Sequence, residues 1–163
     1  MNTKYKIGDI LATKSNSFIS KLIRYLSKSK YSHLALIIFI SETEIQLIEA
    51  DGFYTRNIRY RNINDYINEA DVYTCDLTDK QRQDIVEYAI SKIGQKYDYF
   101  LVFILFLKFT FGIKIKIKDT DDDICSELVN DCYSSVNLKL SKKRFPIPDD
   151  VIKSELLRYV GSI

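Results

Sequence analysis

The sequence is poor in several residue types on which protein function often depends. Its 163 residues include one histidine, two prolines, five glycines and three cysteines, none of them in a CxxC pair. The odd number of cysteines argues against a disulfide framework, and with only one histidine they also argue against a structural zinc site. We therefore expect no metal and no cofactor. Any histidine-dependent chemistry must use His33.

A strong charge of one sign is also missing. Lysine and arginine number 24 against 22 aspartates and glutamates, which gives a net charge of +2, and no basic stripe stands out. We therefore expect no nucleic acid partner. The hydrophobic fraction of 46% and the low glycine and proline content exclude a disordered chain. The length fits one domain over residues 1–163 and allows a real hydrophobic core.

Apolar runs long enough to cross a membrane are absent as well. The most apolar stretch, residues 99–111, is interrupted by Lys108 and is too short to span a bilayer. A buried helix is the expected structure; a lipid-facing or acyl-chain-lining surface is the alternative, which leaves peripheral membrane contact open. Residues 1–9 lack an apolar stretch of signal-peptide type. We expect a cytoplasmic protein, or one delivered without a signal peptide, for example by a phage or virus.

Hydrophobic periodicity predicts an α+β fold in which a mostly antiparallel sheet packs against helices. Thr78 and Gln81 have the spacing of a capping box and predict a helix start, and Asp149 or Asp150 is expected to cap a final short helix. The expected strands are 7–12, 34–40, 44–50, 53–58 and 70–75; the expected helices are 17–26, 64–69, 78–93, 98–111 and 124–134, with 113–118 extended.

His33 directly precedes the apolar run 34–40, so it lies at or near the start of a core strand that can hold its ring rigidly. Histidine is well suited to proton transfer near neutral pH. The next expected strand, 44–50, would pair with this run as a hairpin. Glu49 then falls opposite about residue 34 and close to His33, which would give a buried glutamate its partner. Seen alone, a single histidine is more often a satisfied core residue, so its partners decide its role.

Cys125 lies at the start of the expected helix 124–134, where backbone N–H groups and the helix dipole favour a thiolate. The same N–H groups can form an oxyanion hole. A cysteine there, an imidazole on a strand and a residue that orients the imidazole make a thiol nucleophile site. The acidic run 121–123 acts against this, because nearby carboxylates raise a thiol pKa. The alternative is an inert, half-buried cysteine; we expect core packing for Cys132 and no chemistry for Cys75.

Five short motifs along the chain carry a family resemblance. They are Gly8-Asp9-Ile10, Tyr31-Ser32-His33, Ile48-Glu49-Ala50, Gly94-Gln95-Lys96-Tyr97-Asp98 and Cys125-Ser126-Glu127-Leu128-Val129. They resemble the motifs of the circularly permuted NlpC/P60 proteins, and most closely those of the permuted papain-like amidases of YiiX/YebB type. Each motif is weak alone, but five in the same order over nearly the whole chain make a strong signal. Histidine precedes glutamate and cysteine, which is the order that permutation implies.

The resemblance implies a permuted papain-like NlpC/P60 fold with Cys125 as nucleophile, His33 as base and Glu49 as the orienting residue. It also implies that Tyr97 lies near the oxyanion, and Ser126 is expected to share in oxyanion or substrate binding. We therefore expect a thiol hydrolase, either a peptidase or amidase or a lipid acyl hydrolase or acyltransferase, that forms a thioester intermediate. Its substrate would be of peptide, peptidoglycan or lipid type. The alternative is a non-catalytic lipid- or peptide-binding module, or a virion or complex component, on the same fold, with an oligomeric state that the sequence leaves open.

Overall fold

An antiparallel sheet forms the centre of the protein in a computed structural model that describes residues 4–51, 57–95, 125–144 and 146–163. Its six strands have the order β4-β3-β2-β1-β5-β6, and each neighbouring pair is antiparallel. The strands are β1 (Ile10–Thr13), β2 (His33–Ile40), β3 (Ile45–Asp51), β4 (Asn57–Asn62), β5 (Ala70–Cys75) and β6 (Leu157–Ser162). The helices are α1 (Phe18–Ser27), α2 (Asp79–Ser91), α4 (Cys125–Ser134) and α5 (Pro148–Ile152), with a short 3-10 helix, η1 (Ile63–Tyr66). The predicted α+β class and the antiparallel sheet are confirmed.

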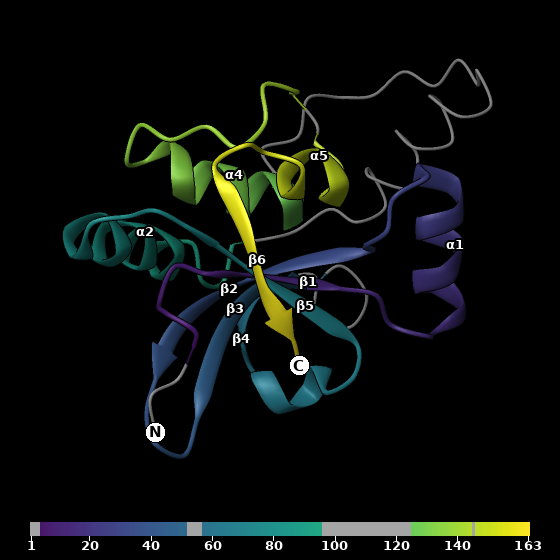
Figure 1. Cartoon of the computed structure of the whole chain (residues 1–163), viewed down its shortest axis with the longest axis horizontal. Coiled ribbons are helices and arrows are strands. Elements are labelled where there is room, and N and C mark those ends of the chain that lie inside the picture. Colours follow the sequence, from purple (N-terminus) through teal and green to yellow (C-terminus); the bar gives the residue numbers. More distant parts are fainter. Residues whose placement is uncertain (1–3, 52–56, 96–124, 145) are drawn as a thin grey trace.

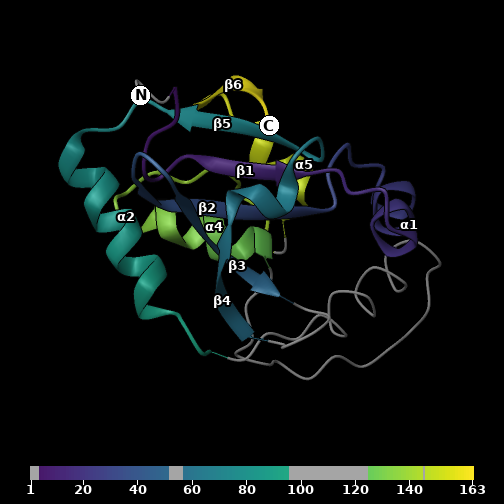
Figure 2. The ribbon, with the colours of Figure 1, turned by 90° about the horizontal axis from the view of Figure 1, so that it is seen from below.

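The two faces of the sheet have different covers, because successive side chains of a strand point to opposite faces. On one face, here called the helix face, Leu34 and Leu36 of β2 pack with Leu128 and Tyr133 of α4. Figure 1 shows α4 and α5 on this side of the sheet. Figure 2 shows α1 and α2 at opposite ends of the molecule, with α4 running alongside β2.

The opposite face of the sheet, here called the η1 face, carries a smaller cluster of buried apolar residues. Ala35 and Ile37 of β2 lie on it with Leu47 of β3, and Ile63 of η1 packs against them. Figure 1 shows η1 as the short teal helix on the side of the sheet opposite α4. The sheet is therefore buried on both sides, which explains why β2 is an almost continuous apolar run.

Local sequence signals set the ends of the helices. The Thr78 hydroxyl accepts from the Gln81 backbone N–H and the Gln81 side chain accepts from the Thr78 N–H, so the predicted capping box is present at the start of α2. The Ser17 side chain accepts from the Ser20 N–H at the start of α1. Such caps satisfy N–H groups that have no partner within the helix.

Several expected elements differ from the structure. The expected strand 53–58 is replaced by β4, which begins later, at Asn57. The strand β6 was not expected, because it is an edge strand whose partly exposed residues, with Gly161 among them, lack a clear apolar pattern. The predicted helix 64–69 is the shorter η1. The predicted segments 98–111 and 113–118 lie outside the described residues.

The expected cap of the final helix, α5, is also different. Ile147 occupies the N-cap position, and its N–H donates to the Asp150 carboxylate at 3.1 Å, so Asp150 lies inside the helix rather than before it. Asp149 accepts instead from the segment that precedes β2. None of the helices within the described ranges has the length and apolar character that a membrane crossing needs.

Candidate active site

The single histidine and Glu49 form a hydrogen-bonded pair. His33 is the first residue of β2, and Glu49 lies on β3 opposite Ala35, one residue from the expected register. Since His33 and Ala35 are two residues apart, they share a face, and the side chains of His33 and Glu49 meet there. His33 Nε2 lies 2.9 Å from Glu49 Oε2. Glu49 is only 3% exposed, while the His33 side chain keeps 22% exposure at the end of the sheet.

Glu49 is the acceptor for several donors besides His33. Arg59, directly opposite it on β4, donates to Oε1 from Nε at 3.2 Å and from Nη2 at 3.1 Å. The Tyr66 hydroxyl of η1 donates to Oε2, beside the imidazole. Arg61 Nε lies 3.5 Å from Oε1, at ion-pair distance. Sequence reasoning missed these three partners. Arg59 and Arg61 are two residues apart in the segment after Glu49, so on a neighbouring strand both would face the same side as Glu49, and this spacing could have identified them.

This environment fixes the charge of Glu49. Burial acts to raise the pKa of the Glu49 carboxyl, but the hydrogen bonds from His33, Tyr66 and Arg59 outweigh it and lower the pKa to about 2. Burial and the charge of Glu49 raise the pKa of Tyr66, which keeps its hydroxyl a donor. An ionised carboxylate only accepts, so it favours the tautomer of His33 with hydrogen on Nε2 and the lone pair on Nδ1.

Helix α4 begins at Cys125, as predicted, and the structure describes the backbone of this residue. The Tyr133 hydroxyl near the end of α4 donates to Gly8 O at 2.7 Å, and the Gly8 N–H donates to Ile37 O at 2.7 Å. Tyr133 is eight residues after Cys125, about 12 Å along a helix, and Ile37 is four residues after His33, about 13 Å along a strand. Because α4 lies alongside β2 (Figure 2), its first turn is level with the start of β2.

Two faces of the sheet are involved in this arrangement. α4 packs on the helix face. His33 is two residues before Ala35, so its side chain is on the η1 face, where it contacts Glu49. His33 is the first residue of its strand, so its imidazole lies at the end of the sheet. A site that combines the His33 imidazole with the start of α4 would therefore lie at this end of the sheet.

Of the other cysteines and predicted site residues, the structure describes three, and all three are buried. Ser126 is the second residue of α4 and is fully buried, and Tyr97 lies outside the described residues. Cys132 is fully buried in the core, as expected. Cys75 is 2% exposed at the end of β5, and burial raises the pKa of its thiol, which opposes thiolate formation.

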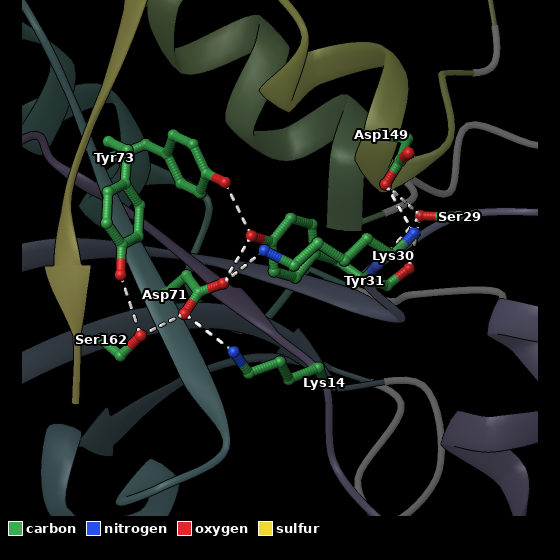
Figure 3. A network of polar contacts seen from close by, with 9 residues as sticks. Lys14, Ser29, Lys30, Tyr31, Asp71, Tyr73, Asp149 and Ser162 are labelled. Atoms are coloured by element: carbon green, nitrogen blue, oxygen red, sulfur yellow. Dashed lines mark hydrogen bonds and ion pairs between the residues drawn. The ribbon is translucent and has the colours of Figure 1, made fainter.

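Side-chain bonds anchor the segment that leads into His33 (Figure 3). The Ser29 hydroxyl donates to Asp149 Oδ1 at 2.7 Å, and the Lys30 N–H donates to the same oxygen at 2.8 Å. The Ser32 N–H donates to Thr13 O at 2.9 Å. These contacts tie the start of β2 to α5 and β1, so they hold the backbone of His33 in place.

Asp71 on β5 anchors the same segment from a second direction (Figure 3). The Tyr31 hydroxyl donates to Asp71 Oδ2 at 2.6 Å, and Ser162 of β6 donates to Oδ1 at 2.6 Å. Lys14 and Lys30 each place Nζ 2.9 Å from this carboxylate. Burial acts to raise the pKa of Asp71, but these donors lower it well below the usual range. Sequence reasoning predicted the anchoring role of neither Asp71 nor Asp149, because the partners of both are distant in the chain.

The structure thus places an imidazole–carboxylate pair at the start of β2, and a helix that begins at a cysteine packs against the same sheet. The model of the permuted papain-like amidase enzymes, the YaeF/YiiX or C92 family, matches residues 4–146, and the chain belongs to this family. The family resemblance of the sequence motifs is confirmed. Membership supports a function of the cysteine hydrolase type. Comparison with curated proteins gives no match.

The fold is similar to that of a solved structure, YiiX from Escherichia coli O157:H7. The two share 19% sequence identity, with a TM-score of 0.71 over 99% of each chain. The E. coli protein is described as a metalloprotein. In the part of the present chain that the structure describes, no three His, Cys, Asp or Glu side chains come together as metal ligands would.

Proposed function

We propose that this protein is a cysteine hydrolase that cleaves an amide bond of peptide or isopeptide type, or an acyl bond, with Cys125, His33 and Glu49 as its triad. The observation that carries the proposal is the 2.9 Å contact between the only imidazole of the chain and a buried carboxylate. Membership of the papain-like amidase family supports the reaction class.

In the proposed reaction, His33 accepts the proton of the Cys125 thiol at Nδ1, because Glu49 holds the hydrogen on Nε2. The thiolate adds to the carbonyl carbon of the substrate. Backbone N–H groups at the start of α4, with Ser126 and Tyr97, stabilise the oxyanion. The imidazolium then donates its proton to the leaving group as the C–N or C–O bond breaks and a thioester remains. Water, deprotonated by His33, hydrolyses the thioester and restores the thiol.

Substrates of peptide or peptidoglycan type fit this reaction, and so does a lipid acyl group. Each has a carbonyl carbon that bears a leaving group, which is all that the thiolate attack requires. In this proposal the scissile carbonyl binds at the end of the sheet, between the start of α4 and the partly exposed His33 imidazole. A substrate therefore does not need to enter the core.

Selective alkylation tests the nucleophile. Folded protein is treated with limiting iodoacetamide, and the modified cysteines are identified by mass spectrometry. We expect Cys125 to react first, because Cys75 and Cys132 are buried and serve as internal controls. Cys125→Ser should abolish rapid labelling, and His33→Gln should slow labelling of Cys125 near neutral pH, since the base is lost.

A turnover assay on the same protein preparation then tests whether the chain is an enzyme. Turnover of peptidoglycan-derived peptides and of acylated lipids is measured for wild-type and Cys125→Ser protein. Release of product by the wild type alone supports the proposal. Rapid labelling of Cys75 or Cys132 before Cys125 contradicts the assignment of the nucleophile, and selective labelling without turnover of either substrate class favours a binding module.

A further inference from the structure

The carboxylate that holds His33 is shared between the imidazole and two arginines. Its Oε2 oxygen faces His33 at 2.9 Å and the Tyr66 hydroxyl. Its Oε1 oxygen accepts two hydrogen bonds from Arg59 and has Arg61 Nε at 3.5 Å. Two arginines on the oxygen that faces away from the imidazole are more than is needed to orient one imidazole ring.

The charges around Glu49 can be assigned element by element. From β4, Arg59 is directly opposite Glu49, while Arg61 also lies 3.2 Å from Asp65 Oδ2 of η1, which offsets its charge. From η1, Tyr66 is a neutral donor. From β1, the neighbour of His33 is the uncharged Thr13, and from α4 the titratable group that the proposed mechanism pairs with His33 is the Cys125 thiol, which is the same in every variant compared below. Among the described residues, Arg59 is therefore the cation that forms two hydrogen bonds with Glu49.

A carboxylate next to an imidazole ordinarily favours the protonated, cationic ring. A guanidinium on the same carboxylate acts in the opposite direction, and in a buried site the two effects are weakly screened. Arginine remains charged throughout the range in which histidine titrates. The Glu49–Arg59 pair therefore offers His33 an oriented acceptor with no net charge.

We propose that Arg59 is a positioning residue that neutralises Glu49, so that Glu49 orients the His33 ring without drawing it into its charged form. The inference rests on the proposed role of His33 as a base. A base must be neutral to accept a proton, and the Glu49–Arg59 pair keeps the ring neutral at a lower pH than a lone carboxylate would. The two hydrogen bonds from one guanidinium to Oε1 also fix which oxygen is left for the imidazole.

The experiment uses the fact that the chain has one histidine, so that its imidazole C–H signal in a proton NMR spectrum needs no assignment. The signal is followed from pH 4 to 9 in the wild type and in Arg59→Gln, Glu49→Gln and the double variant. We expect the midpoint of the titration to rise by about one pH unit in Arg59→Gln and to fall by a similar amount in Glu49→Gln. In the double variant it should return close to the wild-type value.

Arg158→Gln is the matched control, because Arg158 lies on β6 at the opposite edge of the sheet from β4 and pairs with the exposed Asp76. Its midpoint should equal that of the wild type. Circular dichroism confirms that each variant is folded; if Arg59→Gln does not fold, the comparison of Glu49→Gln with the double variant decides. Equal midpoints in the wild type and Arg59→Gln, or in Glu49→Gln and the double variant, overturn the inference. Absence of turnover in the wild type would overturn the proposed function and leave this titration result intact.

Discussion

At the residue scale, Glu49 is the most constrained side chain of the candidate site. It is buried, it is ionised, and it accepts from β2, β4 and η1 at once. A buried carboxylate is tolerated only when such donors replace the water it has lost. The same donors that orient the imidazole therefore also make Glu49 a source of stability.

The charge of Glu49 makes the free energy of unfolding depend on pH. Its pKa is lowered to about 2 in the folded protein, so its contribution is complete above the ordinary carboxyl value and is lost as the pH falls toward 2. We expect a loss of up to about 3 kcal/mol over that interval, measured by urea denaturation at several pH values. Glu49→Gln should flatten this acid slope. An unchanged slope would show that Glu49 is not the group responsible.

Removal of the imidazole is the second change at this scale. His33→Ala should lower kcat/KM by at least about 1000-fold, because the thiol then has neither a base nor a proton donor for the leaving group. The fold should remain, since His33 lies at the end of its strand with a partly exposed side chain. Steady-state kinetics with thermal unfolding as control measure both effects. Near wild-type turnover would exclude a base at this position.

At the scale of elements, the start of β2 is held by contacts from α5 and β5. Asp149 accepts from Ser29 and Lys30, and Asp71 accepts from Tyr31 (Figure 3). The residues immediately before His33 are thus fixed by partners on α5 and β5 that lie forty or more positions away in the sequence. The position of the imidazole depends on these anchors as well as on the sheet.

Two adjacent aspartates of α5 allow a matched test of the anchor. Asp149→Ala removes the acceptor for the Lys30 N–H, which should then exchange faster with solvent, and should cost about 1–3 kcal/mol of stability. Asp150→Ala is the control, because Asp150 bonds to Ile147 and Lys143 instead. Hydrogen exchange read by NMR distinguishes the two. Equal exchange of Lys30 in both variants would show that Asp149 does not anchor this segment.

The elements differ in how well the sequence predicts them, for physical reasons. β2 and the capping box at Thr78 were predictable, because an apolar run and a local hydrogen-bond motif are written in neighbouring residues. The His33–Glu49 contact followed from a hairpin, which is also local. The anchoring role of Asp149, the contact of Arg59 with Glu49 and the strand β6 were not predicted, since each depends on partners that only the folded protein brings close.

At the scale of the whole molecule, a buried ion pair ties three parts of the fold together away from His33. Arg82 of α2 donates to Asp9 Oδ1 at 3.0 Å and to the carbonyl oxygens of Ile7 and Cys75. Asp9 precedes β1, and Cys75 ends β5. This contact lies at the other end of β1 from Thr13, which pairs with His33.

Loss of this ion pair should affect stability and leave the imidazole unaffected. Arg82→Met leaves the buried Asp9 charge without its cation and should cost about 3 kcal/mol or more. Lys80→Met, which breaks an exposed pair with Asp84 on the same helix, should cause no measurable change. Denaturation measures the first effect. A shift in the His33 titration in Arg82→Met would contradict the separation of this contact from the candidate site.

The imidazole half of the candidate site comes from elements that follow one another in the chain, β2, β3, β4 and η1, whereas the helix with the cysteine comes from a distant segment. Contacts between neighbours in the chain form before long-range ones. During synthesis and folding, the histidine can therefore be paired with its carboxylate while the cysteine is still an ordinary thiol. With Cys125 as the proposed nucleophile, a chain in which α4 has not yet docked on β2 would carry the imidazole–carboxylate pair without a thiol beside it.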